Sequence, residues 1–156
     1  MRLLDILYRV SNWCVGFLIV LFVSLMVIDV NIGVFYRYVL NSAISWTEEL
    51  SRYCMVWAAY LGMSFAVRDN QHMGLYFIVE QFSPKVRCYL ELASRIIMMI
   101  FLIVVFRYSL SHLKVVKIQS SPSMEISMFW PYLAVTAGMG LMMLENLRHI
   151  ISIKFK

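Results

Sequence analysis

The stretch WCVGFLIVLFVSLMVI, residues 13–28, contains no charged residue and decides the class of fold. It lies within an apolar run over about residues 13–36, and a helix needs about 20 mostly apolar residues to cross a bilayer. The chain is 62% hydrophobic and 15% charged, whereas soluble domains are about 45–50% apolar and about 25% charged. The sequence therefore predicts an all-α integral membrane protein.

Three further segments predict membrane helices, at about residues 47–67, 88–111 and 127–147, within a single membrane domain over residues 1–156. Arg52, Arg95 and Arg107 interrupt or bound the second and third of these segments. The connection DNQHMGLYFIVEQFSP, residues 69–84, mixes apolar and polar side chains and is too short to cross. We expect a short amphipathic helix at about residues 70–82 that lies in the membrane interface.

Lysine and arginine residues near the segment ends predict the orientation, because cytoplasmic connections carry the excess of them. The side of the two termini carries eight, Arg2, Arg9, Arg68, Lys85, Arg87, Arg148, Lys154 and Lys156, and the other side carries five, Arg37, Arg52, Arg107, Lys114 and Lys117. Both termini are therefore expected in the cytoplasm. The first apolar run exceeds the core of a cleavable signal peptide and has no A-x-A-like site after it, so we expect the first helix to be retained.

Charged residues inside the apolar segments come mostly in pairs. Each costs about 2.5–3.5 kcal/mol on insertion scales and therefore indicates pairing or function. An acidic residue precedes a basic one by four positions in the three pairs Glu48 and Arg52, Glu91 and Arg95, and Glu145 and His149. This spacing places both partners on one helix face. We expect structural neutralisation in preference to a transport path.

Asp29 differs from these residues, because no basic residue stands three or four positions after it in the first span. One interpretation is a proton or cation relay. The other is a contact with another helix or another subunit. The sequence leaves both open.

The stretch NSAISWTEELSRY, residues 41–53, is the most polar patch in the first half of the chain. Ser45 and Glu48 have the spacing of a capping box, in which the serine caps the helix and the glutamate reaches back. Glu48 and Glu49 would lie in the first turn, where the helix dipole favours negative charge. Trp46 is placed to anchor at the membrane interface. The patch thus has local structural roles and requires no catalysis.

Small residues recur every four positions in two of the predicted spans. Ala58, Gly62 and Ala66 follow this pattern in the second span, and Ala134 and Gly138 follow it in the fourth. Small residues at this spacing let helix backbones approach closely. Both sets are therefore expected at helix–helix contacts.

Several functional classes do not fit the sequence. The net charge of +5 is spread over segment ends and forms no basic block, which argues against nucleic-acid binding. The cysteines Cys14, Cys54 and Cys88 form no C-x-x-C motif. His72, His112 and His149 lie near span ends, where they cannot form a buried haem pair. No catalytic or phosphate-binding motif is present, so we expect neither enzyme activity nor a cofactor.

A longer pattern indicates a family. The segments RYVLN at 37–41 and WTEELSRY at 46–53, followed by Trp57, Gly62, Ala66, Arg68 and His72, resemble the small membrane subunit of tripartite ATP-independent periplasmic (TRAP) transporters. The resemblance is strong over the first half, and the second half agrees in length and in its four-span layout. It marks Arg37, Asn41, Trp46, Glu48, Glu49, Arg52, Trp57, Gly62, Arg68 and His72 as a structural or assembly motif.

The resemblance implies a division of labour in a bacterial inner membrane. In that family a periplasmic binding protein captures an organic acid, and a large membrane subunit carries the substrate and sodium sites. The small subunit, which this chain resembles, braces the large subunit and helps to dock the binding protein. The implied partners are thus these two proteins and membrane lipids, and Na⁺ is expected to bind the large subunit.

An alternative of a different class is a small four-helix, proton-coupled multidrug exporter with Asp29 as its coupling acid. Such exporters are shorter than this chain and generally lack an interfacial helix and charged connections. Selectivity among C4-dicarboxylates, keto acids and sugar acids such as sialic acid is expected to lie outside this chain.

Overall fold

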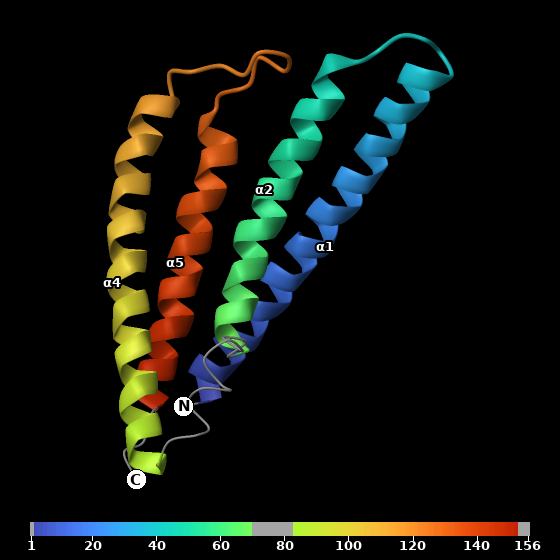
Figure 1. Ribbon diagram of the computed structural model, residues 1–156. Helices are drawn as coiled ribbons and strands as arrows, with labels where there is room; N and C mark the ends of the chain where they lie inside the picture. Colours follow the sequence, from blue (N-terminus) through green and yellow to red (C-terminus); the bar gives the residue numbers. More distant parts are fainter. Residues whose placement is uncertain (1, 70–82, 153–156) are drawn as a thin grey trace.

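The computed structural model describes residues 2–69 and 83–152, and Figure 1 shows its helices. They are α1 (Arg2–Tyr38), α2 (Ser45–Arg68), α4 (Pro84–Val116) and α5 (Phe129–Ser152). In these two ranges the only β-type pairing is an isolated bridge between Ser120 and Ser127. The predicted all-α class is therefore confirmed. The predicted interfacial helix at residues 70–82, with His72, lies outside the described residues.

The four helices form a row rather than a closed bundle. α1 packs on α2, α2 on α5, and α5 on α4, so the order across the row is α1, α2, α5, α4 (Figure 1). The connection between α1 and α2 and the connection between α4 and α5 lie at the same end of the row, at the top of Figure 1. A row leaves much apolar surface uncovered, which suits contact with lipid or with another membrane protein.

The outer helices of the row carry the strongest membrane signal. Two helical segments in the described part of the chain, Ser11–Tyr38 and Val86–Val116, are long and apolar enough to cross a membrane. Only 11% of the most apolar window of each is buried, in contrast to the core helix of a soluble protein. Trp13 in α1 is 82% exposed and Tyr89 in α4 is 67% exposed. Crossing by α2 and α5 stays a prediction.

Most helix ends differ from the predicted ones by a few residues, but α1 begins at Arg2, well before the predicted residue 13. α4 continues past residue 111 to Val116, and α5 begins at Phe129 instead of 127 because Ser127 pairs with Ser120. The turn after α1 contains Asn41 at a φ of 49°. Asparagine tolerates this left-handed conformation better than most side chains. This gives the asparagine of the RYVLN segment a local role in reversing the chain.

Gly138 marks the closest helix contact, between α5 and α2. A Cβ at Gly138 would lie 2.8 Å from the carbonyl oxygen of Tyr60 and 3.0 Å from its carbonyl carbon, and Ala134, one turn earlier, is 0% exposed. The predicted small-residue contact of the fourth span is therefore confirmed. Further along the same contact lies the buried core of Val67, Leu102, Met139 and Met142.

The small residues of α2 behave differently. A Cβ at Gly62 would meet nothing within 4 Å, and Ala66 is exposed. The predicted close approach at Gly62 is therefore wrong within this chain. The reason is rotational: α2 contacts its neighbours through the face that contains Leu61, Ser64 and Val67, which are buried. Gly62 points away from that face.

Candidate functional site

The charged motif lies at the end of the row where the two connections meet. An open groove of about 710 Å³ is lined there by the end of α1, the first half of α2, the α4–α5 loop and the start of α5. Four of the predicted motif residues line it: Arg37, Glu48, Glu49 and Arg52. The structure thus brings four charged members of the motif together around one space, whereas Arg68 lies at the other end of α2.

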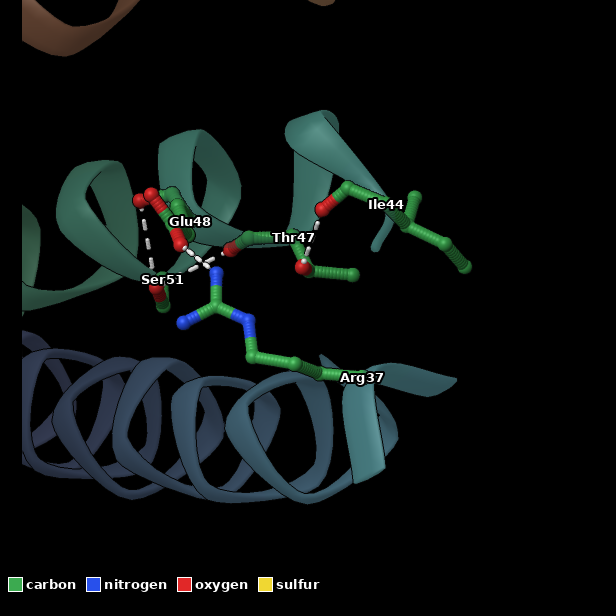
Figure 2. Close-up of polar contacts among 5 residues, drawn as sticks. All are labelled: Arg37, Ile44, Thr47, Glu48 and Ser51. Atoms are coloured by element: carbon green, nitrogen blue, oxygen red, sulfur yellow. Dashed lines mark hydrogen bonds and ion pairs between the residues drawn. The ribbon is translucent and has the colours of Figure 1, made fainter. Parts of the chain in front are cut away.

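Glu48 is paired with Arg37, and not with Arg52 as predicted. The Arg37 guanidinium reaches from the end of α1 to the Glu48 carboxylate in α2 (Figure 2). The side chains of Arg37 and Glu48 are 52% and 61% exposed, and exposed pairs contribute about 0.2–1 kcal/mol. The pair therefore fixes how the two helix ends lie relative to each other more than it stabilises the fold.

The predicted capping box at Ser45 and Glu48 is also wrong. Ile44 occupies the N-cap position in extended conformation and makes no side-chain cap hydrogen bond, so Ser45 is already in the helix. The first turn is instead fastened by hydroxyl groups: Thr47 Oγ1 donates to the Ile44 carbonyl oxygen at 2.9 Å, and Ser51 Oγ donates to the Thr47 carbonyl oxygen at 3.0 Å (Figure 2). Glu48 is unavailable for capping because a guanidinium is a stronger partner for a carboxylate than a neutral amide.

Glu49 holds the α4–α5 loop. Its Oε2 accepts hydrogen bonds from the backbone N–H groups of Ser123 and Met124, each at 3.0 Å, and its Oε1 accepts one from the Tyr53 hydroxyl. Glu49 is only 8% exposed. The sequence predicts that Glu49 interacts with the helix dipole, and the structure adds a contact to residues more than 70 positions away. No local pattern could indicate this contact.

The α4–α5 loop that Glu49 contacts is also closed on itself. The backbone N–H of Ser121 donates to the Ile126 carbonyl oxygen at 2.8 Å, and that of Met128 donates to the Gln119 carbonyl oxygen at 2.9 Å. Glu125 takes a positive φ of 55° at the reversal. With Glu49 bound from the side, α2 and this loop form one hydrogen-bonded unit.

Arg52 is exposed and lines the groove. It forms no hydrogen bond or ion pair with any residue in the described ranges 2–69 and 83–152. Arg37, Glu48 and Glu49 all have partners. Arg52 is thus the charged groove residue that makes no direct bond within the described ranges.

Trp46, Trp57, Gly62 and Arg68 of the motif lie along α2. Trp57 stacks on Phe22 of α1 with ring centroids 5.4 Å apart, and Trp46 is 39% exposed. At the far end, Arg68 donates to Asp69, and this hydrogen bond lowers the pKa of the Asp69 carboxyl. The Arg68 carbonyl oxygen lies 2.8 Å from Nε2 of His149 in α5. These contacts join α2 to both of its neighbours.

Arg95 has a partner other than the predicted Glu91. It is 5% exposed, and its Nη1 donates to Asn146 Oδ1 in α5 at 3.4 Å. Asn146, which is 0% exposed, donates in return through Nδ2 to the Arg95 carbonyl oxygen at 3.0 Å. The predicted Glu91–Arg95 ion pair is not formed. Asn146 was not singled out from the sequence, because a single asparagine near a span end gives no periodic signal.

Asp29 lies in the contact between α1 and α2. It is 4% exposed, and its Oδ2 has no hydrogen-bond partner among the described residues. Because α1 packs on α2, this burial places Asp29 against a helix of its own chain rather than on the exposed surface. In the same residues, no group of three or more His, Cys, Asp or Glu could hold a metal ion.

We expect Asp29→Asn to keep or raise the melting temperature of the purified chain and to leave transport by its complex intact. A buried carboxylate without a full set of partners is costly to keep charged, and asparagine has nearly the same shape without the charge. The measurement is thermal unfolding in detergent together with uptake into liposomes. Lost uptake at an unchanged melting temperature would instead assign Asp29 to a proton or cation relay.

Comparison with known proteins agrees with the family resemblance of the sequence. The family described as "Tripartite ATP-independent periplasmic transporters, DctQ component" matches residues 25–154. That range includes Asp29, every groove residue and the whole of α2, α4 and α5.

Two curated proteins are similar to the chain. A "Putative TRAP transporter small permease protein" of Haemophilus influenzae is 36% identical over 89 residues, which are 57% of this chain and 55% of that protein. An "Isethionate TRAP transporter permease protein DctMQ" of Oleidesulfovibrio alaskensis is 23% identical over 128 residues, which are 76% of this chain and 19% of that protein. The matched region thus spans about half of the first relative and about a fifth of the second.

Proposed function

This chain belongs to the DctQ family of TRAP transporter components, and from that premise we propose that it braces the large transport subunit of such a transporter. The observation that carries the proposal is the helix row with its open groove. The motif residues hold α1, α2 and the α4–α5 loop together, while most apolar side chains of α1 and α4 stay exposed. Family membership sets aside a self-contained multidrug exporter.

The partnership is supported by the second relative. Its name joins M and Q components in one permease protein, and the match with this chain covers about a fifth of the length of that protein. A region of this kind within one longer permease supports association with a large subunit. The exposed apolar side chains of α1 and α4 offer the surface for that association.

The proposed setting is the bacterial inner membrane, which α1, α2, α4 and α5 all cross, with both termini in the cytoplasm. In this orientation the groove and the two connections at its end face the periplasm. The Glu49-held loop then lies where a substrate-binding protein would arrive, which supports a part for this chain in docking it.

The cargo we propose is an organic acid, a C4-dicarboxylate, a keto acid or a sugar acid such as sialic acid, carried with sodium. The substrate and sodium sites are assigned to the large subunit, and this chain is assigned no cofactor. The isethionate of the second relative's name belongs to that protein, whose match with this chain covers 19% of its length.

The test is a tagged pull-down from native membranes in mild detergent, followed by mass spectrometry of the proteins that co-purify. We expect a large polytopic membrane protein in stoichiometric amount, because the exposed apolar face of the row needs a partner or lipid. The control is an unrelated tagged multi-pass protein of similar abundance. A lone chain or homodimer that catalyses proton-coupled transport in liposomes would contradict the proposal.

A further inference from the structure

The groove at the connection end combines charged residues with an apolar lining. Its volume is about 710 Å³. A cylinder with the diameter of an α-helix, about 10–12 Å, has this volume when it is about 6–9 Å long. That length is between one and two helical turns. Val56 and Tyr60 of α2 and Val135 of α5 line its deeper part, and Pro122 and Ser123 of the α4–α5 loop line it as well.

Arg52 is the charged side chain of this groove that makes no direct bond within the described residues. Glu48 is paired with Arg37, and the Glu49 carboxylate accepts hydrogen bonds from Tyr53 and two backbone N–H groups. The charges of Arg37, Arg52, Glu48 and Glu49 sum to zero, but Arg52 forms no hydrogen bond or ion pair with a residue of the described ranges. Its guanidinium is therefore open to an anion from outside.

The position of Arg52 and the lining beside it favour one source for that anion. α2 has 24 residues and is thus about 36 Å long, against a hydrocarbon core of about 30 Å. Arg52 is the eighth residue of α2, so its Cα lies about 8 Å inside a centred core, and its long stem lets the guanidinium reach either the headgroup region or the groove. The groove sets the apolar side chains of Val56, Tyr60 and Val135 beside Arg52, and a protein helix that carries a carboxylate among apolar side chains matches both.

We propose that the groove receives a helix of the large transport subunit, and that an Asp or Glu side chain on that helix forms an ion pair with Arg52. This inference rests on the proposed function, in which α2 crosses the membrane beside a large subunit. A guanidinium suits the role because its planar fork matches a carboxylate with two parallel hydrogen bonds. The apolar side chains below it would pack against the same helix.

The experiment compares wild type, Arg52→Lys, Arg52→Gln and Arg52→Glu, each tagged and co-expressed with the large subunit that the native pull-down identifies. Arg52→Gln is expected to lower the retained large subunit about tenfold or more, because removing one partner of a buried ion pair leaves the other uncompensated. Arg52→Lys should lose less, and Arg52→Glu should lose most. An acid-to-lysine change in a helix of the large subunit should restore the complex with Arg52→Glu.

The control is Lys117→Gln, which removes a positive charge at the same end of the row. Lys117 is exposed just after α4, its side chain forms no hydrogen bond or ion pair among the described residues, and it does not line the groove. Its replacement should leave the yield of complex unchanged. Melting of each variant chain alone separates lost assembly from lost folding, and we expect Arg52→Gln to melt like wild type.

Three outcomes would overturn the inference. One is an unchanged complex with Arg52→Gln. A second is an intact complex that has lost a bound phospholipid in native mass spectrometry, which would make a lipid the occupant. A third is equal loss with Lys117→Gln, which would indicate a general effect of removing a positive charge at this end of the row. If wild type itself retains no large subunit, the proposed function fails first.

Discussion

Gly138→Ala is expected to lower the melting temperature of the purified chain, and Gly138→Leu is expected to prevent stable folding. The added Cβ would lie 2.8 Å from the carbonyl oxygen of Tyr60 and 3.0 Å from its carbonyl carbon. These are backbone atoms, so α5 must move away from α2 to relieve the overlap. Overpacking of this kind typically costs about 1–3 kcal/mol and sometimes more.

The chain supplies a matched control in Gly62, which is also a glycine in the interior of a helix. A Cβ there meets nothing within 4 Å, and alanine is intrinsically better than glycine in a helix by about 1 kcal/mol. Gly62→Ala is therefore expected to melt at the same or a higher temperature than wild type. The measurement is thermal unfolding in detergent, read by size-exclusion fluorescence. Equal melting of Gly138→Ala and Gly62→Ala would contradict the contact at Gly138.

These two glycines also show how far the sequence determines the packing. Both stand in a small-xxx-small pattern, and the pattern correctly places small residues on one helix face. It does not say which neighbour that face meets. The rotation of each helix about its own axis decides this, because α2 and α5 are both contacted on two sides. Gly138 faces one of these contacts, whereas Gly62 faces away from both neighbours of α2.

The helices themselves were predictable, because apolar runs of sufficient length leave few alternatives to a helix in lipid. Their ends were less so. α5 begins after Ser127 because that residue pairs with Ser120 across the loop. An apolar window has no means of detecting a bridge between two serines.

Partners of the charged residues were the least predictable feature. Pairing rules within one helix consider only positions three and four apart, and they assigned Glu48 to Arg52 and Glu91 to Arg95. In the structure Glu48 pairs with Arg37 of the preceding helix. Arg95 bonds Asn146, which is 51 positions away. The family resemblance marked Arg37 and Glu48 as motif residues, but it did not reveal that they contact each other.

Glu49→Ala is expected to release the α4–α5 loop and to lower the melting temperature of the chain. Among the described residues, the substitution removes the side chain that accepts from the Ser123 N–H, and it takes one of two partners from Met124, whose N–H also lies 3.3 Å from Ser121 Oγ. Hydrogen bonds to a charged group contribute about 1.5–3 kcal/mol each. The measurement is amide hydrogen exchange, in which Ser123 and Met124 should exchange about tenfold faster or more.

Two further variants separate the hydrogen bonds from the charge and from a general surface effect. Glu49→Gln keeps a carbonyl oxygen for the Ser123 and Met124 N–H groups but loses the charge, so an intermediate change is expected. Glu48→Ala removes an exposed carboxylate from the same turn, and it should leave exchange in the loop near wild type. Loop exchange as fast in Glu48→Ala as in Glu49→Ala would mean that the ion pair with Arg37, and not the Glu49 carboxylate, holds the loop. If Glu49 alone holds the α4–α5 loop, Glu49→Ala should weaken docking of a binding protein at this end while the large subunit stays bound.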